Sequence, residues 1–335
     1  MMIILIDHLF ISNFNIMKKL FLRLLLYVFC IVLILEVLVR VFHLTKDYPV
    51  RFVDELGVER WVPNQEGYSV TGNRRQNFSK FNINSSGYNS YRDFEPSKDK
   101  VELALVGDSF IEGFHQPYYN SIGKKIEAKI NGVEVYEIGY GGYDFADQLH
   151  LIHQYQSFFD LIDLVVIGIK FEDDLTRNEY GILKERMKLE SPMYRSLRNI
   201  KLLVYLQNIG AFSAAIKMTT TLFSLGQNNT SIHKKEDVNA TQKRYVKYIK
   251  NFQSLVTKYG YDKTRFVLLL DKENSPKVFL DFLDKNSYNY IDFGEEINQS
   301  KIPTTLIYDQ HWNNYGRNIV SNLISVYFKE RVNNH

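Results

Sequence analysis

The residue types needed for serine-based acyl transfer stand in this chain where turns would expose them. Ser109 follows Gly107-Asp108 directly after the apolar run VELALV, and Asp309 and His311 stand two positions apart before the last helical pattern. A serine hydroxyl is a weak nucleophile unless a base takes its proton, and the base needs an acid that orients it. We therefore predict that Ser109 is a nucleophile, His311 its base and Asp309 the acid that orients His311.

Two glycines and an acidic residue follow the next two apolar runs. The run VEVYEI ends in GYGGY, which contains Gly141 and Gly142, and LVVIGI is followed by KFEDDL, which contains Asp173. Closely spaced glycines let backbone N–H groups approach a ligand, as an oxyanion hole requires. Each feature alone is equally typical of an ordinary turn or helix N-cap. Their joint placement indicates a site, because ligands of an open parallel sheet bind beyond the carboxyl ends of its strands.

Short apolar runs alternate with helical patterns from residue 100 onward, which is typical of an α/β domain with a mostly parallel sheet. The expected strands are Val101–Val106, Val133–Ile138, Leu164–Ile169, Arg265–Leu270 and Tyr288–Ile291. Helical patterns lie around 120–131, 146–159, 242–259, 275–286 and 313–330. Five strands covered by these helices predict a three-layer α/β/α sandwich, with Asp309 and His311 in a loop before the last helix.

Over about residues 100–330 these blocks resemble the SGNH, or GDSL-like, hydrolases. The resemblance implies a flavodoxin-like fold and a Ser109 whose own N–H serves the oxyanion hole. It also implies that Gly142, or Gly141 nearly as well, donates a second N–H, and that Asp309 and His311 form the final block. A membrane-anchored member is indicated by the Glu-x-x-x-Arg pattern at Glu36 and Arg40.

Two departures from the family pattern bear on activity. Asp173 stands where an asparagine amide usually completes the oxyanion hole, and an ionised carboxylate would repel a developing oxyanion. Losing one such donor typically costs about 10²–10³ in rate. The final block is Asp-x-His instead of Asp-x-x-His. A literal Asp-x-x-His occurs at Asp147–His150, which we interpret as a helix surface away from the site.

The N-terminal segment predicts a membrane anchor. The run from Leu20 to Val39 is almost wholly apolar and close to the ~20 residues that span a bilayer. Basic residues at its start favour a cytoplasmic N-terminus, and no small residues follow at which a signal peptide would be cleaved. We expect an uncleaved, single-pass signal-anchor in the cell membrane with the rest of the chain outside the cytoplasm. Glu36 and Arg40 share a helix face and are expected to pair near the far interface.

The expected organisation has four parts. Residues 1–16 form an N-terminal extension, with Met17 as an alternative start, and 17–45 form the signal-anchor. Residues 46–98 form an extracytoplasmic lead-in of loops and short strands. The hydrolase-like domain covers 99–330 and contains a helical insert at about 176–241.

Composition excludes several function classes. A formal charge of +3 without a block of basic residues gives no reason to expect a nucleic-acid partner. The single cysteine, Cys30, lies in the apolar segment, so a disulfide framework and a thiolate metal site are excluded. The eight histidines lack the spacing of a ligand cluster, and no metal or organic cofactor is predicted.

These features together favour a membrane-anchored serine ester hydrolase that acts on acyl esters. The resemblance and the expected location point to O-acetyl esters of cell-surface carbohydrate. Two alternatives stay open: an O-acetyltransferase that uses the same Ser-His-Asp chemistry, and a weakly active or inactive binding or assembly protein, for which Asp173 is the support. The expected partners are the lipid bilayer and an acyl ester or carbohydrate substrate.

Overall fold

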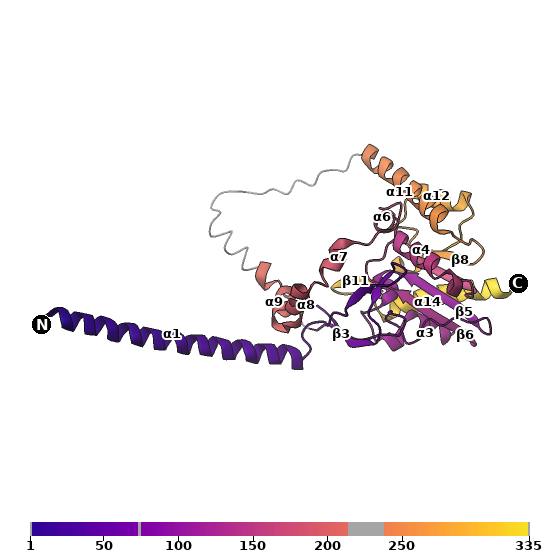
Figure 1. The fold of residues 1–335 in the computed structure, drawn as a ribbon. Coiled ribbons are helices and arrows are strands. Elements are labelled where there is room, and N and C mark those ends of the chain that lie inside the picture. Colours follow the sequence, from indigo (N-terminus) through magenta and orange to yellow (C-terminus); the bar gives the residue numbers. More distant parts are fainter. Residues whose placement is uncertain (1, 73–74, 214–237, 334–335) are drawn as a thin grey trace. The chain divides into compact units, whose positions relative to one another are not determined.

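The computed structural model describes residues 2–72, 75–213 and 238–333 of the chain (Figure 1). The chain divides into two compact units. The smaller unit comprises 1–45 and 195–225, and the larger comprises 46–194 and 226–335.

A five-stranded parallel sheet forms the centre of the larger unit. Its order is β6-β5-β7-β8-β9, which places the first of these strands between the second and the third and creates a switch point between β5 and β7. The strands are β5 (Val101–Gly107), β6 (Val133–Gly139), β7 (Leu164–Gly168), β8 (Phe266–Leu270) and β9 (Tyr290–Asp292). The predicted three-layer sandwich is confirmed, and the strand ends lie within two residues of the predicted ones.

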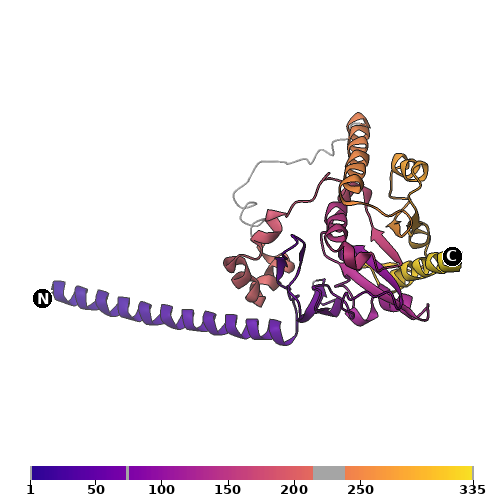
Figure 2. The same cartoon turned by 45° about the vertical axis from the view of Figure 1, so that its right-hand side comes forward.

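Helices cover both faces of the sheet because successive strand residues point into different apolar cores (Figures 1 and 2). Leu103 and Leu105 pack in one core with Val320 and Ile324, and Ala104 and Val106 pack in the other. The first core is covered by α2 (Ser109–Glu112), α3 (Ile122–Glu127), α13 (Gly294–Asn298) and α14 (Asn314–Asn333). The second is covered by α4 (Phe145–Gln154), α11 (Val238–Tyr259) and α12 (Lys277–Lys285).

The lead-in forms two antiparallel hairpins and shares the core of the sheet. Trp61, Phe81 and Ile83 are buried in the same apolar cluster as the α4 face. The hairpins are β1 (Arg51–Val53) with β2 (Glu59–Trp61) and β3 (Gln65–Thr71) with β4 (Asn77–Ile83).

The expected insert at 176–241 does not behave as one element. Its first part, with α7 (Lys184–Lys188), belongs to the larger unit, and from Arg195 the chain belongs to the smaller one. This second part holds most of α8 (Pro192–Asn199) and α9 (Lys201–Asn208). Residues 214–237 lie outside the described part of the chain, and α11 begins inside the expected insert at Val238. The remaining short helices are η1 (Tyr118–Asn120), α5 (Gln156–Phe159) and α6 (Phe171–Asp174).

Helix α1 (Met2–Val41) dominates the smaller unit. Residues Met17–Val41 are long and apolar enough to cross a membrane, and only 6% of the most apolar window is buried. The expected extension 1–16 continues the same helix. Arg40 pairs with Glu36 at 2.6 Å, as their spacing predicted.

Candidate active site

Ser109 stands at the carboxyl edge of the sheet, where β5 gives way to α2. Asp108 caps the helix, since its carboxylate accepts the backbone N–H of Phe110 at 2.9 Å. Gly107 permits the tight turn, because a Cβ there would lie 2.5 Å from the Ile111 side chain. The serine is therefore the first residue of a helix and is half-buried beside the switch point.

His311 and Asp309 lie on a short hairpin, so the expected loop is a wrong prediction. Strand β10 (Thr305–Leu306) pairs antiparallel with β11 (Asp309–Trp312). The Asn313 amide stabilises the base of this hairpin by donating to the carbonyls of Pro303 and Thr305. Such a small two-stranded element has too weak an alternation to be recognised in a sequence.

The structure brings the three predicted residues into hydrogen-bonding contact. His311 Nε2 lies 2.7 Å from Ser109 Oγ, and His311 Nδ1 contacts Asp309 Oδ1. Asp309 Oδ1 also accepts the backbone N–H of His311 at 3.0 Å. Burial alone would raise the pKa of Asp309, but the hydrogen bonds from the His311 side chain and backbone lower it. An ionised Asp309 thus orients the imidazole whose other nitrogen faces the serine.

His115 is a neighbour of this relay that sequence reasoning missed. Its ring centroid lies 4.0 Å from that of His311, and its Nε2 lies 3.6 Å from Asp309 Oδ2. Burial, assisted by the nearby His311, lowers the pKa of His115 to about 3, so the ring is neutral at physiological pH. Nothing in its sequence position signals this role, because it reaches the site through the left-handed turn at Gly113, whose φ is +66°.

His115, Asp309 and His311 also form a candidate metal-ligating group, with donor atoms within 4.8 Å of one another. Asp309 and His311 already bond to each other. The buried Nδ1 of His115 has no hydrogen-bond partner in the described part of the chain. Metal-bound histidines almost always donate their second nitrogen to a neighbouring acceptor. The arrangement therefore suits proton transfer better than metal binding.

In the glycine loop after β6, hydrogen bonds hold both neighbours of the Gly142 N–H: the Gly141 N–H before it and the Gly142 carbonyl after it. Gly141 donates its N–H to the buried Glu112 carboxylate, which the Trp61 indole holds at 2.7 Å. Gly142 has a φ of +94°, and its carbonyl accepts a hydrogen bond from Arg186. Because Gly141 is already engaged, Gly142 is the better of the two predicted donors. The Gly142 N–H donates to no residue that the structure describes.

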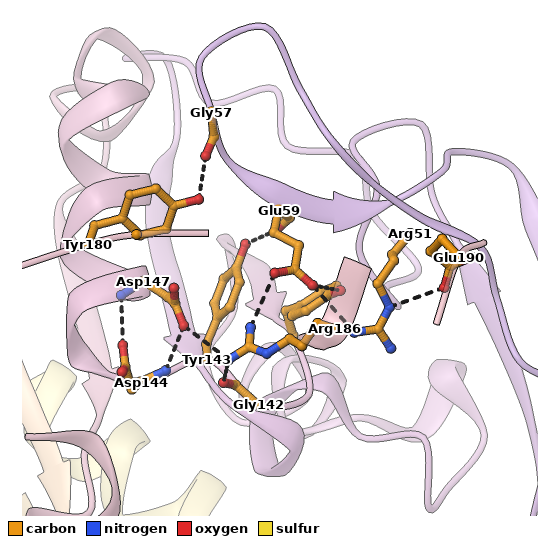
Figure 3. A network of polar contacts seen from close by, with 12 residues as sticks. Arg51, Gly57, Glu59, Gly142, Tyr143, Asp144, Asp147, Tyr180, Arg186 and Glu190 are labelled. Carbon is orange, nitrogen blue, oxygen red and sulfur yellow. Dashed lines mark hydrogen bonds and ion pairs between the residues drawn. The ribbon is translucent and has the colours of Figure 1, made fainter. Parts of the chain in front are cut away.

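Arg186 links this loop to a buried polar network (Figure 3). Figure 3 shows its guanidinium between Gly142, Glu59 and Asp147, and the two carboxylates each lie 3.4 Å from it. Glu59 is 3% exposed and also accepts the Tyr140 hydroxyl at 2.6 Å. Arg186 comes from α7, so the region expected to be an insert supplies a contact to the predicted oxyanion loop.

Asp173 lies on α6 with its side chain exposed, and no contact joins it to Ser109 or His311 within the described residues. It lines a pocket of about 560 Å³ together with Phe110 and Trp312, the neighbours of the relay residues. The next residue, Asp174, is buried instead, and burial raises its pKa well above the ordinary value. That Asp173 belongs to an oxyanion hole therefore stays a prediction.

Lys170 places a positive charge at the same edge of the sheet. Its Nζ lies 2.7 Å from Asp108 Oδ2 and 3.9 Å from the centre of the Phe110 ring. The ion pair holds the side chain of Asp108 beside Ser109 and offsets a negative charge next to the predicted nucleophile.

The literal Asp-x-x-His at Asp147–His150 is not a helix surface, and that interpretation is wrong. Both side chains are buried. Asp147 pairs with Arg177 at 2.9 Å, and the His150 ring stacks on Tyr180 with centroids 3.7 Å apart. The pair is held by residues 176–194 that cover α4, which the helical pattern alone could not indicate.

Comparison with known proteins gives similarity of fold only. No family model matches the chain, and no curated protein matches its sequence. A lipolytic protein of the G-D-S-L family from Veillonella parvula is similar at 14% identity and a TM-score of 0.36, covering 68% of this chain and 98% of that one. A lipase/acylhydrolase from Enterococcus faecalis is similar at 14% identity and a TM-score of 0.38, covering 69% and 96%. An acetylxylan esterase from Geobacillus stearothermophilus, a catalytic mutant, is similar at 13% identity and a TM-score of 0.34, covering 67% and 92%.

Because the identities and TM-scores are low, the function has to be inferred from the residues of this chain themselves.

Proposed function

We propose that this chain is a membrane-anchored serine ester hydrolase that removes acyl groups, O-acetyl above all, from carbohydrate outside the cytoplasm. One observation carries the proposal. Ser109 Oγ lies 2.7 Å from His311 Nε2, while the Asp309 carboxylate contacts the other imidazole nitrogen, Nδ1. A nucleophile, a base and an orienting acid in this order are what acyl transfer from an ester requires.

The proposed reaction follows from these contacts. Ser109 Oγ attacks the ester carbonyl and its proton passes to His311 Nε2, while Asp309 stabilises the imidazolium. The N–H groups of Ser109 and Gly142 donate to the oxyanion of the tetrahedral intermediate. As the intermediate collapses, the bond from the carbonyl carbon to the sugar oxygen breaks, and His311 gives its proton to that oxygen, which leaves as the sugar hydroxyl. Water then attacks the acyl-serine with His311 again as the base, which releases the acid and restores the serine hydroxyl.

The pocket beside the relay supports a carbohydrate ester as substrate. Phe110 and Trp312 lie edge to face with ring centroids 4.7 Å apart, and Phe110 also packs against the His311 ring. Aromatic faces with a few polar groups around them are typical of small-molecule sites. Asp173, Gln310 and Asn274 supply hydrogen-bonding groups at the same pocket.

The apolar helix Met17–Val41 supports the proposed location. Its length is sufficient for a bilayer. The basic residues Lys18, Lys19 and Arg23 lie in its first seven residues, so the positive-inside rule puts the N-terminus in the cytoplasm. The larger unit follows the helix and would then lie on the outer side, where cell-surface carbohydrate is.

Transfer of the acyl group to another sugar hydroxyl is a second candidate. The same acyl-serine would form, and the acceptor would replace water in the second step. The observation that favours it is the open pocket of about 560 Å³ beside the relay, which is large enough to admit a sugar next to the acyl group.

The direct test is acetate release by the full-length chain in detergent, with 4-nitrophenyl acetate and an acetylated oligosaccharide as substrates. We expect Ser109→Ala and His311→Ala to abolish release. Ser254→Ala, half-buried on α11, and the exposed His153→Ala are matched controls away from the relay and should leave it unchanged. Acetylated acceptor accumulating in place of acetate would favour the transferase. A folded wild type that releases no acetate and transfers none would overturn both enzyme functions and favour the binding role.

A further inference from the structure

Glu36 is a carboxylate within an apolar helix, and the smaller unit surrounds it with donors. Arg40 pairs with it at 2.6 Å, and the backbone N–H groups of Lys201 and Leu202 donate to it at 3.0 and 2.6 Å. Arg40 in turn donates to the carbonyl of Asn199. A charge in a membrane span is costly unless it is paired in this way. Helix α9 therefore begins against the anchor helix itself.

These contacts set the depth at which α9 starts. Glu36 precedes the end of the apolar stretch at Val41 by five residues, or about 7–8 Å along the helix axis. At the other end of α9, the Asn208 amide donates to the Thr45 hydroxyl at 3.1 Å. The helix thus runs outward beside the last part of the anchor, and its first residues lie beside Glu36, inside the end of the apolar stretch by a depth that suits an interfacial helix.

The segment 195–213, which contains the end of α8 and all of α9, has the composition of an interfacial helix. Between 195 and 213 it carries three basic residues and no acidic one. Its exposed apolar side chains are large: Leu197, Ile200, Ile209 and Phe212. On α8, Leu197 lies on the opposite side from Arg195 at 100° per residue, so apolar and basic side chains occupy different faces. An amphipathic segment with such faces binds in the plane of a membrane interface.

We propose that α8 and α9 form a second membrane contact, in which the apolar face of α8 enters the outer headgroup layer and its basic face binds anionic phosphate groups. This inference rests on the anchor part of the proposed function.

The natural cysteine permits a test with its own control. Cys30 lies exposed on the anchor, so an environment-sensitive fluorophore on Cys30 reports insertion of α1. In a Cys30→Ser background the same fluorophore is attached to Leu197→Cys on α8 or to Gln253→Cys on the exposed side of α11. The full chain is reconstituted in phosphatidylcholine vesicles containing a nitroxide-labelled lipid, with or without phosphatidylglycerol.

We expect the nitroxide lipid to quench most of the fluorescence at Cys30 and at Leu197→Cys, and little of it at Gln253→Cys. Quenching at Cys30 without quenching at Leu197→Cys would overturn the second contact and leave the anchor intact. Absence of quenching at Cys30 would instead overturn the anchor. Quenching between labels that grows with the protein-to-lipid ratio would show that a second copy covers α8, which also contradicts the proposal.

The charge on α8 gives a further arm. Phosphatidylglycerol should strengthen quenching at Leu197→Cys, and the double change Arg195→Glu with Arg198→Glu should remove that increase. Quenching at Leu197→Cys that changes neither with the anionic lipid nor with the charge reversal would contradict phosphate binding by the basic face. A circular-dichroism spectrum and an unfolding temperature equal to those of the wild type are the check that each variant folds.

Discussion

The two halves of the candidate site are built differently. The proton-transfer half consists of side chains, with Ser109 at a strand end and Asp309 and His311 on a hairpin 200 residues later in the chain, held by their own hydrogen bonds. The proposed oxyanion half is backbone at Gly142, held from outside by Arg186 and, through Gly141, by Glu112. The first half is defined by its own reactive groups, whereas the second depends on residues that have no reactive role.

The proton-transfer half should be the more sensitive to a conservative change. Asp309→Asn keeps the shape but removes the charge that stabilises the imidazolium and selects its tautomer. We expect kcat for acetate release to fall about 10⁴-fold. Asp281→Asn, an exposed acid on α12, is the matched control. A loss of less than tenfold would mean that Asp309 does not orient the base.

Gly142→Ala tests the backbone half directly. A side chain is strained at a φ of +94°, and its Cβ would contact the Arg186 guanidinium at 3.5 Å. Displacing one oxyanion donor should lower kcat about 10²–10³-fold. Gly181→Ala, where an added Cβ meets nothing within 4 Å, should have no effect. Equal activity of the two variants would remove Gly142 from the site.

Among the contacts of the described residues, Arg186 reaches the candidate site through the Gly142 carbonyl, so its loss should cost less. We expect Arg186→Ala to lower kcat about tenfold with KM nearly unchanged, because small displacements of a positioned group are felt in the chemical step. Arg186→Lys should retain part of the rate that Arg186→Ala loses. Lys188→Ala, on the same helix, is the control and should leave kcat unchanged. A change confined to KM would assign Arg186 to substrate binding instead.

Asp173→Asn should change the rate least and in the opposite direction. Replacing a carboxylate by an amide removes repulsion of the oxyanion and adds a donor, so kcat should rise severalfold. The control is Glu172→Gln, the neighbouring acid on α6 that lines the same pocket. A fall in kcat for Asp173→Asn would show that this position is not part of the oxyanion hole.

Glu112 predicts a pH effect on stability in the backbone half. Burial raises its pKa from 4.5 to about 7, so the folded chain holds a proton there that the unfolded chain has lost. Stability from this group is complete below pH 4.5 and is lost as the pH rises to about 7, by about 3 kcal/mol. Thermal unfolding should show a shallower fall across this window for Glu112→Gln than for the wild type. The exposed Glu296→Gln should leave the slope unchanged.

The sequence was a good guide to whatever depends on local pattern. Short apolar runs with helical patterns between them predicted the five strands, because buried parallel strands are short, continuous and apolar. Ser109, Asp309 and His311 could be selected because strand ends meet at one edge of a sheet. The pairing of Glu36 with Arg40 followed from helical spacing alone.

Long-range packing set the limit of that reasoning. His115 and Arg186 reach the site through a turn and a helix whose directions depend on tertiary contacts. Asp147 and His150 were expected on a surface because nothing in an amphipathic pattern shows that a later segment will cover it. The partners of Glu36 on α9 lie 165 residues away, beyond the reach of any local signal.

The most direct measurement of the central claim is labelling by a serine-directed fluorophosphonate, followed by mass spectrometry of the digested chain. The proposed relay predicts a single adduct on Ser109 in the wild type, its loss in Ser109→Ala and a severe slowing in His311→Ala. A folded wild type that takes up no probe, or one that carries the adduct on another serine, would contradict Ser109 as the nucleophile.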